Sequence, residues 1–389
     1  MSRLQAEHLY KVFGRRPEAA VERLEGGADR DELRADGTTA AVIDASFEVE
    51  AGQIFVVMGL SGSGKSTLLR MLNGLLEPTA GRVLFDGQDL TALAPRDLRT
   101  VRSRKISMVF QHFALFPHRS VLENAAYGLE VQGVPRAERQ ERAAEALELA
   151  GLKGWETSWP DQLSGGMQQR VGLARALATD ADLLLMDESF SALDPLIRRD
   201  MQDQLLDLQT RLKKTIVFIT HDLNEAMRLG DRIAVMRDGR IVQNGTAEDI
   251  LVRPANDYVA SFIQDVDRSR VLTAGSIMNT GAAAPAGAAT VPAATPVAEL
   301  FTPLARSTDP LTVTDAQGEP AGVVTRDLLL AALSEEAEVP APRTPDATEA
   351  GKPAAAAKAA TAKSPETGDE PAEAATPAHA DEAEVSARA

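Results

Sequence analysis

Short apolar runs of strand length alternate along residues 1–265 with segments whose apolar positions recur at helical spacing. This alternation is typical of an α/β domain built on a parallel sheet. The segment 137–149 has helix-forming composition with apolar positions three and four apart, and Gly151 follows it as a stop, so we expect a helix of a helical insertion there. Four apolar runs are expected to be strands: 54–58, 106–110, 183–186 and 215–220.

Four segments depart from this pattern. Residues 15–37 are polar and helix-prone and interrupt a strand pair, which predicts a surface excursion. Residues 266–296 are rich in Ala, Pro and Gly, which is typical of a linker. Residues 297–334 regain order as a helix, two strands around a Gly/Pro turn and a second helix. Residues 335–389 have two valines as their only apolar side chains besides alanine, so we expect a disordered acidic tail rich in Ala and Pro.

The charge balance limits the classes of ligand. The chain has 41 Lys and Arg against 57 Asp and Glu, a formal net charge of -16, which argues against broad affinity for nucleic acid or for an anionic membrane surface. Any bound phosphate must therefore be captured by a local site. The chain has no cysteine, which excludes disulfides and thiolate metal sites and fits a reducing compartment.

The hydropathy pattern shows neither a secretory signal nor a membrane span. The first residues, 1–14, lack an apolar run behind a basic start. The longest apolar runs fall far short of the roughly 18 residues that a membrane span needs. We therefore expect a protein that stays in the cytoplasm and relies on a partner chain for any membrane channel.

The stretch GLSGSGKS, residues 59–66, has the spacing of a phosphate-binding P-loop between a predicted strand and a helix-like segment. Its glycines let backbone N–H groups converge on phosphate oxygens, and the helix N-terminus adds its dipole. Lys65 would neutralise the β and γ phosphates, Ser66 would bind Mg²⁺, and Thr67 would hold the α phosphate. The alternative is a glycine-rich turn with an incidental lysine. The candidate nucleotide-binding residues here are Gly59, Ser61, Gly62, Ser63, Gly64, Lys65, Ser66 and Thr67.

The apolar run 183–186 leads into two acids, Asp187 and Glu188. The carboxyl end of a buried parallel strand opens onto a ligand crevice, so both carboxylates are delivered to one place. Asp187 is placed to orient water on Mg²⁺, and Glu188 to accept a proton from an attacking water. The alternative is a strand that simply ends in solvated acids.

The stretch LSGGMQQR, residues 163–170, supplies a second phosphate-binding turn. Ser164 offers a hydroxyl, Gly165 and Gly166 expose backbone donors, and the helix that follows presents the positive end of its dipole. The alternative is a bare Ser-Gly-Gly turn. In sequence order with the P-loop and the acids, this stretch resembles the signature of ABC transporter ATP-binding subunits, and the resemblance covers roughly residues 1–265.

The resemblance implies a fold and an assembly. The fold is a RecA-like P-loop NTPase core with an antiparallel β subdomain and a helical subdomain at about 112–170, all within an ATPase domain of residues 1–265. A small CBS-like unit at 297–334 follows the linker at 266–296, and the tail at 335–389 ends the chain. The assembly is a head-to-tail dimer in which one copy caps the γ phosphate bound by the other through Ser164, Gly165, Gly166 and Gln168.

Further site residues follow from the resemblance in the family's sequence order. It implies that Gln111 senses Mg²⁺ and the attacking water, that Asp194 crosses the dimer interface, and that His221 contacts the γ phosphate. A metal site at 221–225 is an alternative for His221, but its ligand count is too low for zinc. The candidate catalytic residues are Glu188, His221 and Gln111, and the candidate metal ligands are Ser66, Gln111 and Asp187.

Four aromatic residues have candidate roles. Phe13 matches the position from which the family stacks a ring on adenine, an interaction of about 1 to 3 kcal/mol. Tyr10 is the competing candidate, and Phe13 could instead be a core residue. By resemblance, Phe113 and Phe116 help form the groove where a cytoplasmic helix of the membrane subunit docks, and the alternative is that both are ordinary core residues.

Three features resemble the class that imports glycine betaine and proline: the insertion 15–37, the stretch 189–205 and the RPANDYV stretch 253–259. The resemblance implies an ATP-hydrolysing subunit peripheral to the cytoplasmic face of the inner or plasma membrane, with ATP and Mg²⁺ as cofactors. Its expected partners are a second copy, a transmembrane permease and, indirectly, a substrate-binding protein, without nucleic acid. Many members carry two CBS modules, whereas residues 297–334 resemble one.

Other functions stay open. The cargo could be an amino acid or another small solute, since other subunits choose it. A soluble ABC ATPase of translation or DNA repair is the alternative of another class, although the sequence shows neither tandem ATPase halves nor a long coiled-coil insertion. A nucleotide-sensing scaffold is disfavoured because both Glu188 and His221 remain.

Overall fold

The predicted α/β class is confirmed, because the largest sheet is mainly parallel and helices flank its strands along the chain. The computed structural model describes residues 2–264, 266–282, 285, 287–307 and 309–334. The predicted disordered tail, 335–389, lies outside the described residues.

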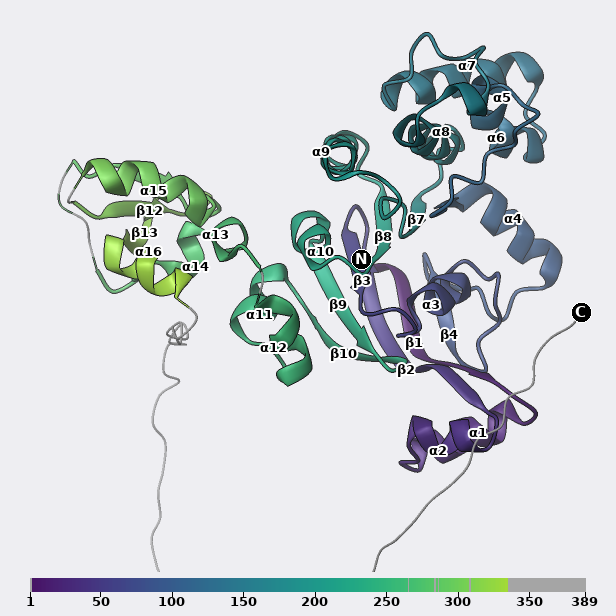
Figure 1. Ribbon diagram of the computed structural model, residues 1–389, viewed down its shortest axis with the longest axis horizontal. Helices are drawn as coiled ribbons and strands as arrows, with labels where there is room; N and C mark the ends of the chain where they lie inside the picture. Colours follow the sequence, from purple (N-terminus) through teal and green to yellow (C-terminus); the bar gives the residue numbers. More distant parts are fainter. Residues whose placement is uncertain (1, 265, 283–284, 286, 308, 335–389) are drawn as a thin grey trace, which may run out of the picture. The chain divides into compact units, whose positions relative to one another are not determined.

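The central sheet has six strands in the order β10-β9-β3-β8-β7-β6 (Figure 1). Strands β9, β3, β8, β7 and β6 are parallel, and β10 is antiparallel to β9 at one edge. Every residue of β3 and β8 is buried, which explains their continuous apolar sequences. All four predicted strands are present, with ends that differ by at most one residue. The strands span Ile54–Met58 (β3), Ile106–Val109 (β6), Leu183–Asp187 (β7), Thr215–Thr220 (β8), Arg232–Arg237 (β9) and Arg240–Gly245 (β10).

A second, antiparallel sheet has the order β2-β1-β4-β5. It shares an apolar core with one face of the central sheet, where Phe47 of β2 stacks on Phe55 of β3 with ring centroids 4.7 Å apart. Leu68 and Leu72 of helix α3 belong to the same core. The elements of this layer span Ser2–Phe13 (β1), Thr39–Glu50 (β2), Ala80–Phe85 (β4), Gln88–Asp89 (β5), Lys65–Leu72 (α3) and Pro95–Lys105 (α4).

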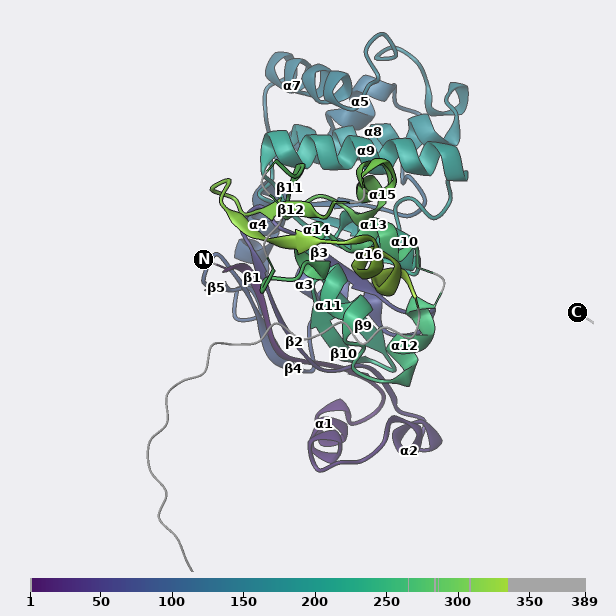
Figure 2. The ribbon, with the colours of Figure 1, turned by 90° about the vertical axis from the view of Figure 1, so that its left-hand side faces the viewer.

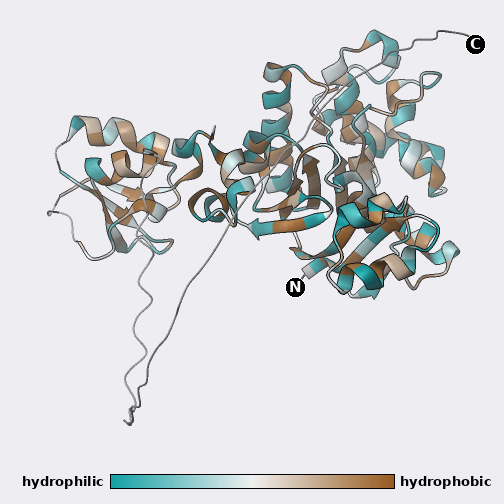
Figure 3. Cartoon of the chain, turned by 60° about the horizontal axis from the view of Figure 1, so that its bottom comes forward, coloured by the Kyte–Doolittle hydropathy of each residue, from teal (hydrophilic) through white to brown (hydrophobic). Residues whose placement is uncertain are grey.

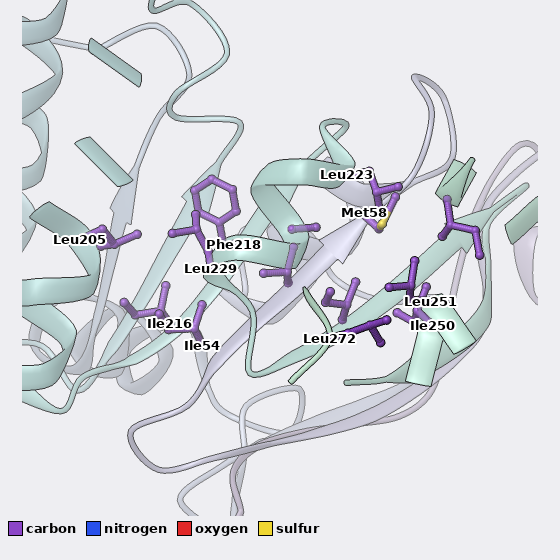
Figure 4. Close-up of a cluster of buried hydrophobic side chains, with 14 of the residues drawn as sticks. Ile54, Met58, Leu205, Ile216, Phe218, Leu223, Leu229, Ile250, Leu251 and Leu272 are labelled. Carbon is purple, nitrogen blue, oxygen red and sulfur yellow. The ribbon is translucent and has the colours of Figure 1, made fainter. Parts of the chain in front are cut away.

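The other face of the central sheet packs against helices that follow β7 in the sequence. Ile54 and Met58 point to this side, whereas Phe55 between them points to the other, as alternation along a strand requires. Figure 4 shows Leu205 of α9 and Leu229 of α10 beside Phe218 of β8, and the strands of the interior are largely brown in Figure 3. The helices span Pro195–Leu212 (α9), Leu223–Leu229 (α10), Ala247–Val252 (α11) and Asp257–Ile263 (α12).

Helices α5 to α8 share a separate apolar core, and α5, α7 and α8 lie together in both ribbon views (Figure 2). The predicted helix 137–149 is confirmed as α7, which begins one residue earlier. Leu147 of α7 packs in the same cluster as Val171 of α8, and Gly151 after α7 has a φ of +73°. The segments span Val121–Ala125 (α5), Tyr127–Val131 (α6), Arg136–Leu149 (α7), a 3-10 turn at Pro160–Gln162, and Gly165–Ala178 (α8).

The insertion 15–37 is more than the expected surface excursion. It forms helices α1 (Pro17–Glu25) and α2 (Arg30–Ala35), as its helix-prone composition indicated. Four of its apolar residues, Ala20, Val21, Leu24 and Leu33, are buried and pack on the β1–β2 strand pair. The first three fall on one helical face within an otherwise charged segment. The cluster contains Tyr10, Val12, Ala20, Val21, Leu24, Leu33, Ala40 and Ile43.

Residues 266–296, expected as a linker, contain two short helices and a strand. Leu272 and Ile277 are buried there. The sequence did not indicate this burial because the segment has few apolar residues. The expected helix, two strands and helix of 297–334 are present, and the likeness of this unit to a CBS module stays a prediction. The elements are Arg268–Val271 (α13), Ala274–Ile277 (α14), Thr290–Pro292 (β11), Val297–Arg306 (α15), Leu311–Thr314 (β12), Pro320–Val324 (β13) and Arg326–Leu333 (α16), with sheet order β11-β12-β13.

Truncation of Leu33 tests the packing of the insertion. Leu33 is fully buried, so Leu33→Ala should lower the free energy of unfolding by about 2 to 5 kcal/mol through lost burial and the cavity left behind. Urea unfolding measures the change. Leu75→Ala is the control, because Leu75 is 50% exposed, and it should cost about 1 kcal/mol or less. Equal costs for the two variants would contradict a packed insertion.

Candidate active site

The sheet topology brings the predicted motifs to one edge. The P-loop follows β3, His221 follows β8, Glu188 follows β7 and Gln111 lies just beyond β6. These four strands are neighbours in the order β3-β8-β7-β6 and run parallel, so their carboxyl ends meet at the same edge of the sheet. Residues more than a hundred positions apart in the sequence therefore share one site.

Two P-loop glycines are required by close backbone contacts. A Cβ at Gly64 would lie 2.2 Å from the carbonyl oxygen of Ala41, and its φ of +104° also favours glycine. A Cβ at Gly59 would lie 2.2 Å from the carbonyl oxygen of Met236. Gly64 is the residue that precedes helix α3, so its conformation sets the direction in which the helix N-terminus faces.

Lys65 is held inside the P-loop. Its Nζ donates to the carbonyl oxygens of Gly59 at 2.8 Å and Leu60 at 3.1 Å, and only 4% of the residue is exposed. The Nζ also lies 3.6 Å from Oε1 of Glu188. Burial lowers the pKa of the Lys65 ammonium, and the Glu188 carboxylate acts against that shift. The Lys65 ammonium thus lies at the position expected for phosphate oxygens to bind.

Ser66 and Asp187 meet directly. The Ser66 hydroxyl donates to Oδ1 of Asp187 at 3.0 Å. Burial raises the pKa of the Asp187 carboxyl, and the Ser66 hydrogen bond opposes this rise. The pair presents oxygen ligands of the kind that a hard divalent cation prefers.

Glu188 connects the other predicted catalytic residues. Its Oε2 lies 3.0 Å from Nδ1 of His221, on the opposite side of the carboxylate from Lys65. Ser191, for which the sequence predicted no role of its own, donates from Oγ to the Glu188 carbonyl at 2.8 Å. Gln111 donates from Nε2 to that Ser191 Oγ at 3.2 Å. The structure therefore brings Gln111, Glu188, His221 and Lys65 into one contact chain.

The two candidate adenine residues differ in exposure. Tyr10 is 6% exposed and belongs to the core under the insertion, so its ring is not available to a ligand. Phe13 ends strand β1, is 45% exposed, and has Nζ of Lys11 5.3 Å from its ring centroid. Phe13 is thus the candidate that presents a ring face.

The structure does not join the signature turn to the P-loop of the same chain. Among the described residues, no hydrogen bond or ion pair links the segment 164–168 to the segment 59–67. Ser164 accepts from the N–H of Met167, and a Cβ at Gly166 would lie 2.5 Å from Ile197.

Gln168 and Asp194 are engaged with nearby backbone. The Gln168 amide donates to the carbonyl oxygens of Pro160 and Leu163. The exposed Asp194 carboxylate accepts from the first N–H groups of α9. The side-chain amide of Gln168 therefore has a local structural use beside its predicted role.

Two arginines that sequence reasoning missed hold the functional loops. Arg198 of α9 donates to the carbonyl oxygens of Phe190, Ser191 and Leu193 and contacts Asp222 beside His221 at 3.4 Å. Its position one helical turn after Asp194 is the signal that could have indicated this role. Arginine donates from five N–H groups in a fixed fork, which suits it to binding several carbonyls of one loop.

Arg175 of helix α8 does the same for the segment after Gln111. It donates to the carbonyl oxygens of Phe113 at 3.0 Å and Ala114 at 2.6 Å, and both residues have positive φ values, of 34° and 48°. Burial lowers the pKa of Arg175. Arg175 also lines a cavity of about 490 Å³ with Phe116 and Val131, whereas Phe113 packs against the core.

Similarity to known proteins identifies the family of this chain. The family model described as "ABC transporter" matches residues 42–191. The glycine betaine transport ATP-binding protein OpuAA of Bacillus subtilis is 61% identical over 71% of this chain and 66% of its own length. The glycine betaine/carnitine transport ATP-binding protein GbuA of Listeria monocytogenes is 58% identical over 72% of this chain and 70% of its own length. The chain belongs to the ABC transporter ATP-binding family.

Solved structures of ABC cassettes share the fold. The dimeric structure of the ATP-binding cassette MJ0796 in a post-hydrolysis state with ADP and Pi has a TM-score of 0.53 and 31% identity, and covers 63% of this chain and 98% of the cassette. The chain is thus an ATP-binding ABC cassette. Its match spans about two thirds of the length of OpuAA and GbuA.

The Asp187→Asn variant of this ABC cassette should trade function for stability. Because burial raises the Asp187 pKa, the ionised form destabilises the folded protein at pH values above that pKa. The neutral amide should raise the free energy of unfolding by about 0.5 to 2 kcal/mol at pH 7. This gain should diminish as the pH falls through the raised pKa, and vanish below the ordinary carboxyl pKa, where the wild-type group is neutral in both the folded and the unfolded protein.

Denaturant unfolding at pH 7 and pH 4, with and without Mg·ATP, measures both effects. The variant should lose the additional stabilisation by Mg²⁺ over ATP alone. A variant less stable than wild type at pH 7, or one stabilised normally by Mg·ATP, would contradict the metal-ligand assignment.

Proposed function

We propose that the chain hydrolyses ATP to drive import of glycine betaine or a related methylated ammonium compound through a separate membrane permease. The proposed cargo rests on sequence similarity. OpuAA, GbuA and the glycine betaine/proline betaine protein ProV of Escherichia coli are 61, 58 and 55% identical to this chain. A trimethylamine N-oxide transport ATP-binding protein of Ruegeria pomeroyi follows at 50%. These named cargoes share a nitrogen atom that carries methyl groups.

The donor set beside the P-loop fits Mg²⁺. Ser66 and Asp187 supply two oxygens 3.0 Å apart in a partly buried position, and Gln111 offers an amide at the end of the neighbouring strand β6. These are the hard ligands that Mg²⁺ takes, alongside water and phosphate oxygens. The ion would neutralise charge on the β and γ phosphates when it is bound.

Glu188 is the proposed general base. It accepts a proton from water at the γ phosphate. The contact between its Oε2 and Nδ1 of His221 fixes the orientation of the carboxylate. Lys65, now beside Oε1, moves its charge toward the phosphates when ATP enters the loop. Glu188 has a φ of +43°, a strained conformation that the Ser191 hydroxyl supports from the carbonyl side.

A second copy of the chain completes the proposed site. Ser164 and Gly165 are exposed at the N-terminus of α8, where backbone N–H groups and the helix dipole favour an anion. Within the described residues they make no polar contact with their own P-loop, and the related cassette MJ0796 is dimeric in its solved structure. We place the signature turn of one copy, with Gln168 and Asp194, against the nucleotide of the other.

The cavity beside Arg175 is the proposed docking site of the permease. It is lined by apolar side chains, including Phe110, Phe116 and Val131, and Val131 is 60% exposed. Arg175, which lines the cavity, donates to the carbonyl oxygens of Phe113 and Ala114, in the segment that follows Gln111. Docking and ATP sensing would therefore share one segment. No helix among the described residues is both long and apolar enough to cross a membrane. Because the similar proteins OpuAA and ProV are transport ATP-binding proteins, we propose a peripheral position at the cytoplasmic face of the inner or plasma membrane.

The cargo is tested by uptake into vesicles. The chain is co-purified with its membrane subunits and substrate-binding protein, and labelled glycine betaine, proline and methionine are compared. We expect ATP-dependent uptake of glycine betaine, which the Lys65→Ala variant abolishes. Methionine is included because methionine import ATP-binding proteins are 47 to 49% identical. Uptake of methionine or proline without uptake of glycine betaine would contradict the proposed cargo.

The docking site is tested by a charge in the cavity. Val131→Glu should weaken co-purification with the permease by about tenfold or more, because an unpaired carboxylate would be buried on docking. Its affinity for Mg·ATP should stay at the wild-type value. Leu75→Glu, an exposed position outside the cavity, is the matched control. Normal co-purification of Val131→Glu would place the permease elsewhere.

A further inference from the structure

The insertion helices reach the phosphate-binding loop through one side chain. Arg30, the first residue of α2, lies 2.9 Å from Asp238 through Nη1 and makes a long hydrogen bond of 3.5 Å from Nη2 to the carbonyl oxygen of Gly62. Arg30 and Asp238 are separated by more than two hundred positions in the sequence. The contact therefore exists only in the folded cassette.

The turn that contains Asp238 is itself bonded to the P-loop. Asp238 and Gly239 connect β9 to β10, and the N–H of Gly239 donates to the carbonyl of Ser63 at 3.0 Å. The carbonyl of Gly239 accepts from the N–H of Ile43 on β2 at 2.8 Å. Arg30 therefore contacts both the P-loop and the turn that supports it.

The charge of Asp238 gives this contact an electrostatic consequence. Asp238 lies in a turn that contacts the loop predicted to receive a polyphosphate, and a bare carboxylate there would repel the anion. Arg30 at 2.9 Å and Arg237 at 3.3 Å counter that charge. Removal of Arg30 leaves Asp238 with Arg237 as its ion-pair partner within the part of the chain that the structure describes, and removes the bond to Gly62.

The insertion is rigid enough to position Arg30. Leu33, one turn along α2, is fully buried in the cluster with Tyr10 and Ile43, and Asp29 caps the helix through the N–H of Arg30. The guanidinium is thus anchored on a packed element and not on a free loop, which reduces the entropy lost when it binds.

We propose that Arg30 is a positioning residue for ATP binding, and that the insertion 15–37 is through Arg30 part of the phosphate-binding site. Arg30 shields the triphosphate from Asp238 and tethers the carbonyl of Gly62 at the tip of the P-loop. The ion pair is partly exposed, so its effect is on nucleotide affinity and is small for global stability.

Nucleotide titrations at low salt test this role. Arg30→Ala should raise the Kd for Mg·ATP about threefold to fivefold, the range expected for one lost exposed ion pair. The KM for ATP should rise in proportion, with kcat at saturating ATP unchanged. The double variant Arg30→Ala/Asp238→Asn should return the Kd to within about twofold of wild type, because the repelling carboxylate is gone. The effect of Arg30→Ala should also shrink in 1 M salt, where the Debye length is about 3 Å.

The matched control is Arg23→Ala, which breaks the 2.8 Å ion pair between Arg23 and Asp36 within the same insertion. It should leave the Kd unchanged. An unchanged Kd for Arg30→Ala, an equal rise for Arg23→Ala, or no recovery in the double variant would each overturn the proposal. Lys65→Ala, titrated in parallel, should lose Mg·ATP binding, and its failure to do so would reject the P-loop assignment separately from the role of Arg30.

Discussion

A buried ammonium group determines how this site is built. The Lys65 Nζ lies inside its own loop, and the cost of removing it from water is offset by two carbonyl oxygens and a carboxylate within 3.6 Å. The same Glu188 carboxylate contacts His221 on its other side. Without nucleotide the Lys65 charge is therefore paired with the carboxylate of the proposed general base. We propose that phosphate oxygens compete with Glu188 for Lys65, so that ATP binding frees the base for water.

Three arginines from three helices support the loops around this site. Arg198 binds the segment after Glu188, Arg175 binds the segment after Gln111, and Arg30 contacts the P-loop. Each donates to backbone carbonyls that regular secondary structure leaves unpaired, and each belongs to a helix packed elsewhere. A shift of α2 would thus displace the P-loop, a shift of α8 the segment after Gln111, and a shift of α9 the segment after Glu188. For α8 this connects the proposed permease cavity with Gln111, the predicted sensor of Mg²⁺ and the attacking water.

The sequence predicted those parts of the fold that local pattern determines. Continuous apolar runs located β3, β7 and β8 because parallel strands are buried on both faces, and the motif at each strand end then placed the candidate site. It could not predict contacts between distant segments, such as Arg30 with Asp238, nor that Tyr10 is buried while Phe13 is exposed. The roles of the individual site residues stay predictions, since the structure shows their arrangement and not their chemistry.

In the proposed assembly, two copies of the chain close on ATP between the P-loop of one and the signature turn of the other. Sedimentation of the Glu188→Gln variant with Mg·ATP tests it most directly, because the amide cannot accept the proton from water and the closed state should persist. We expect a dimer that requires ATP and dissociates into single copies when ATP is removed. A variant that binds Mg·ATP yet sediments as single copies, even together with its permease, would contradict it.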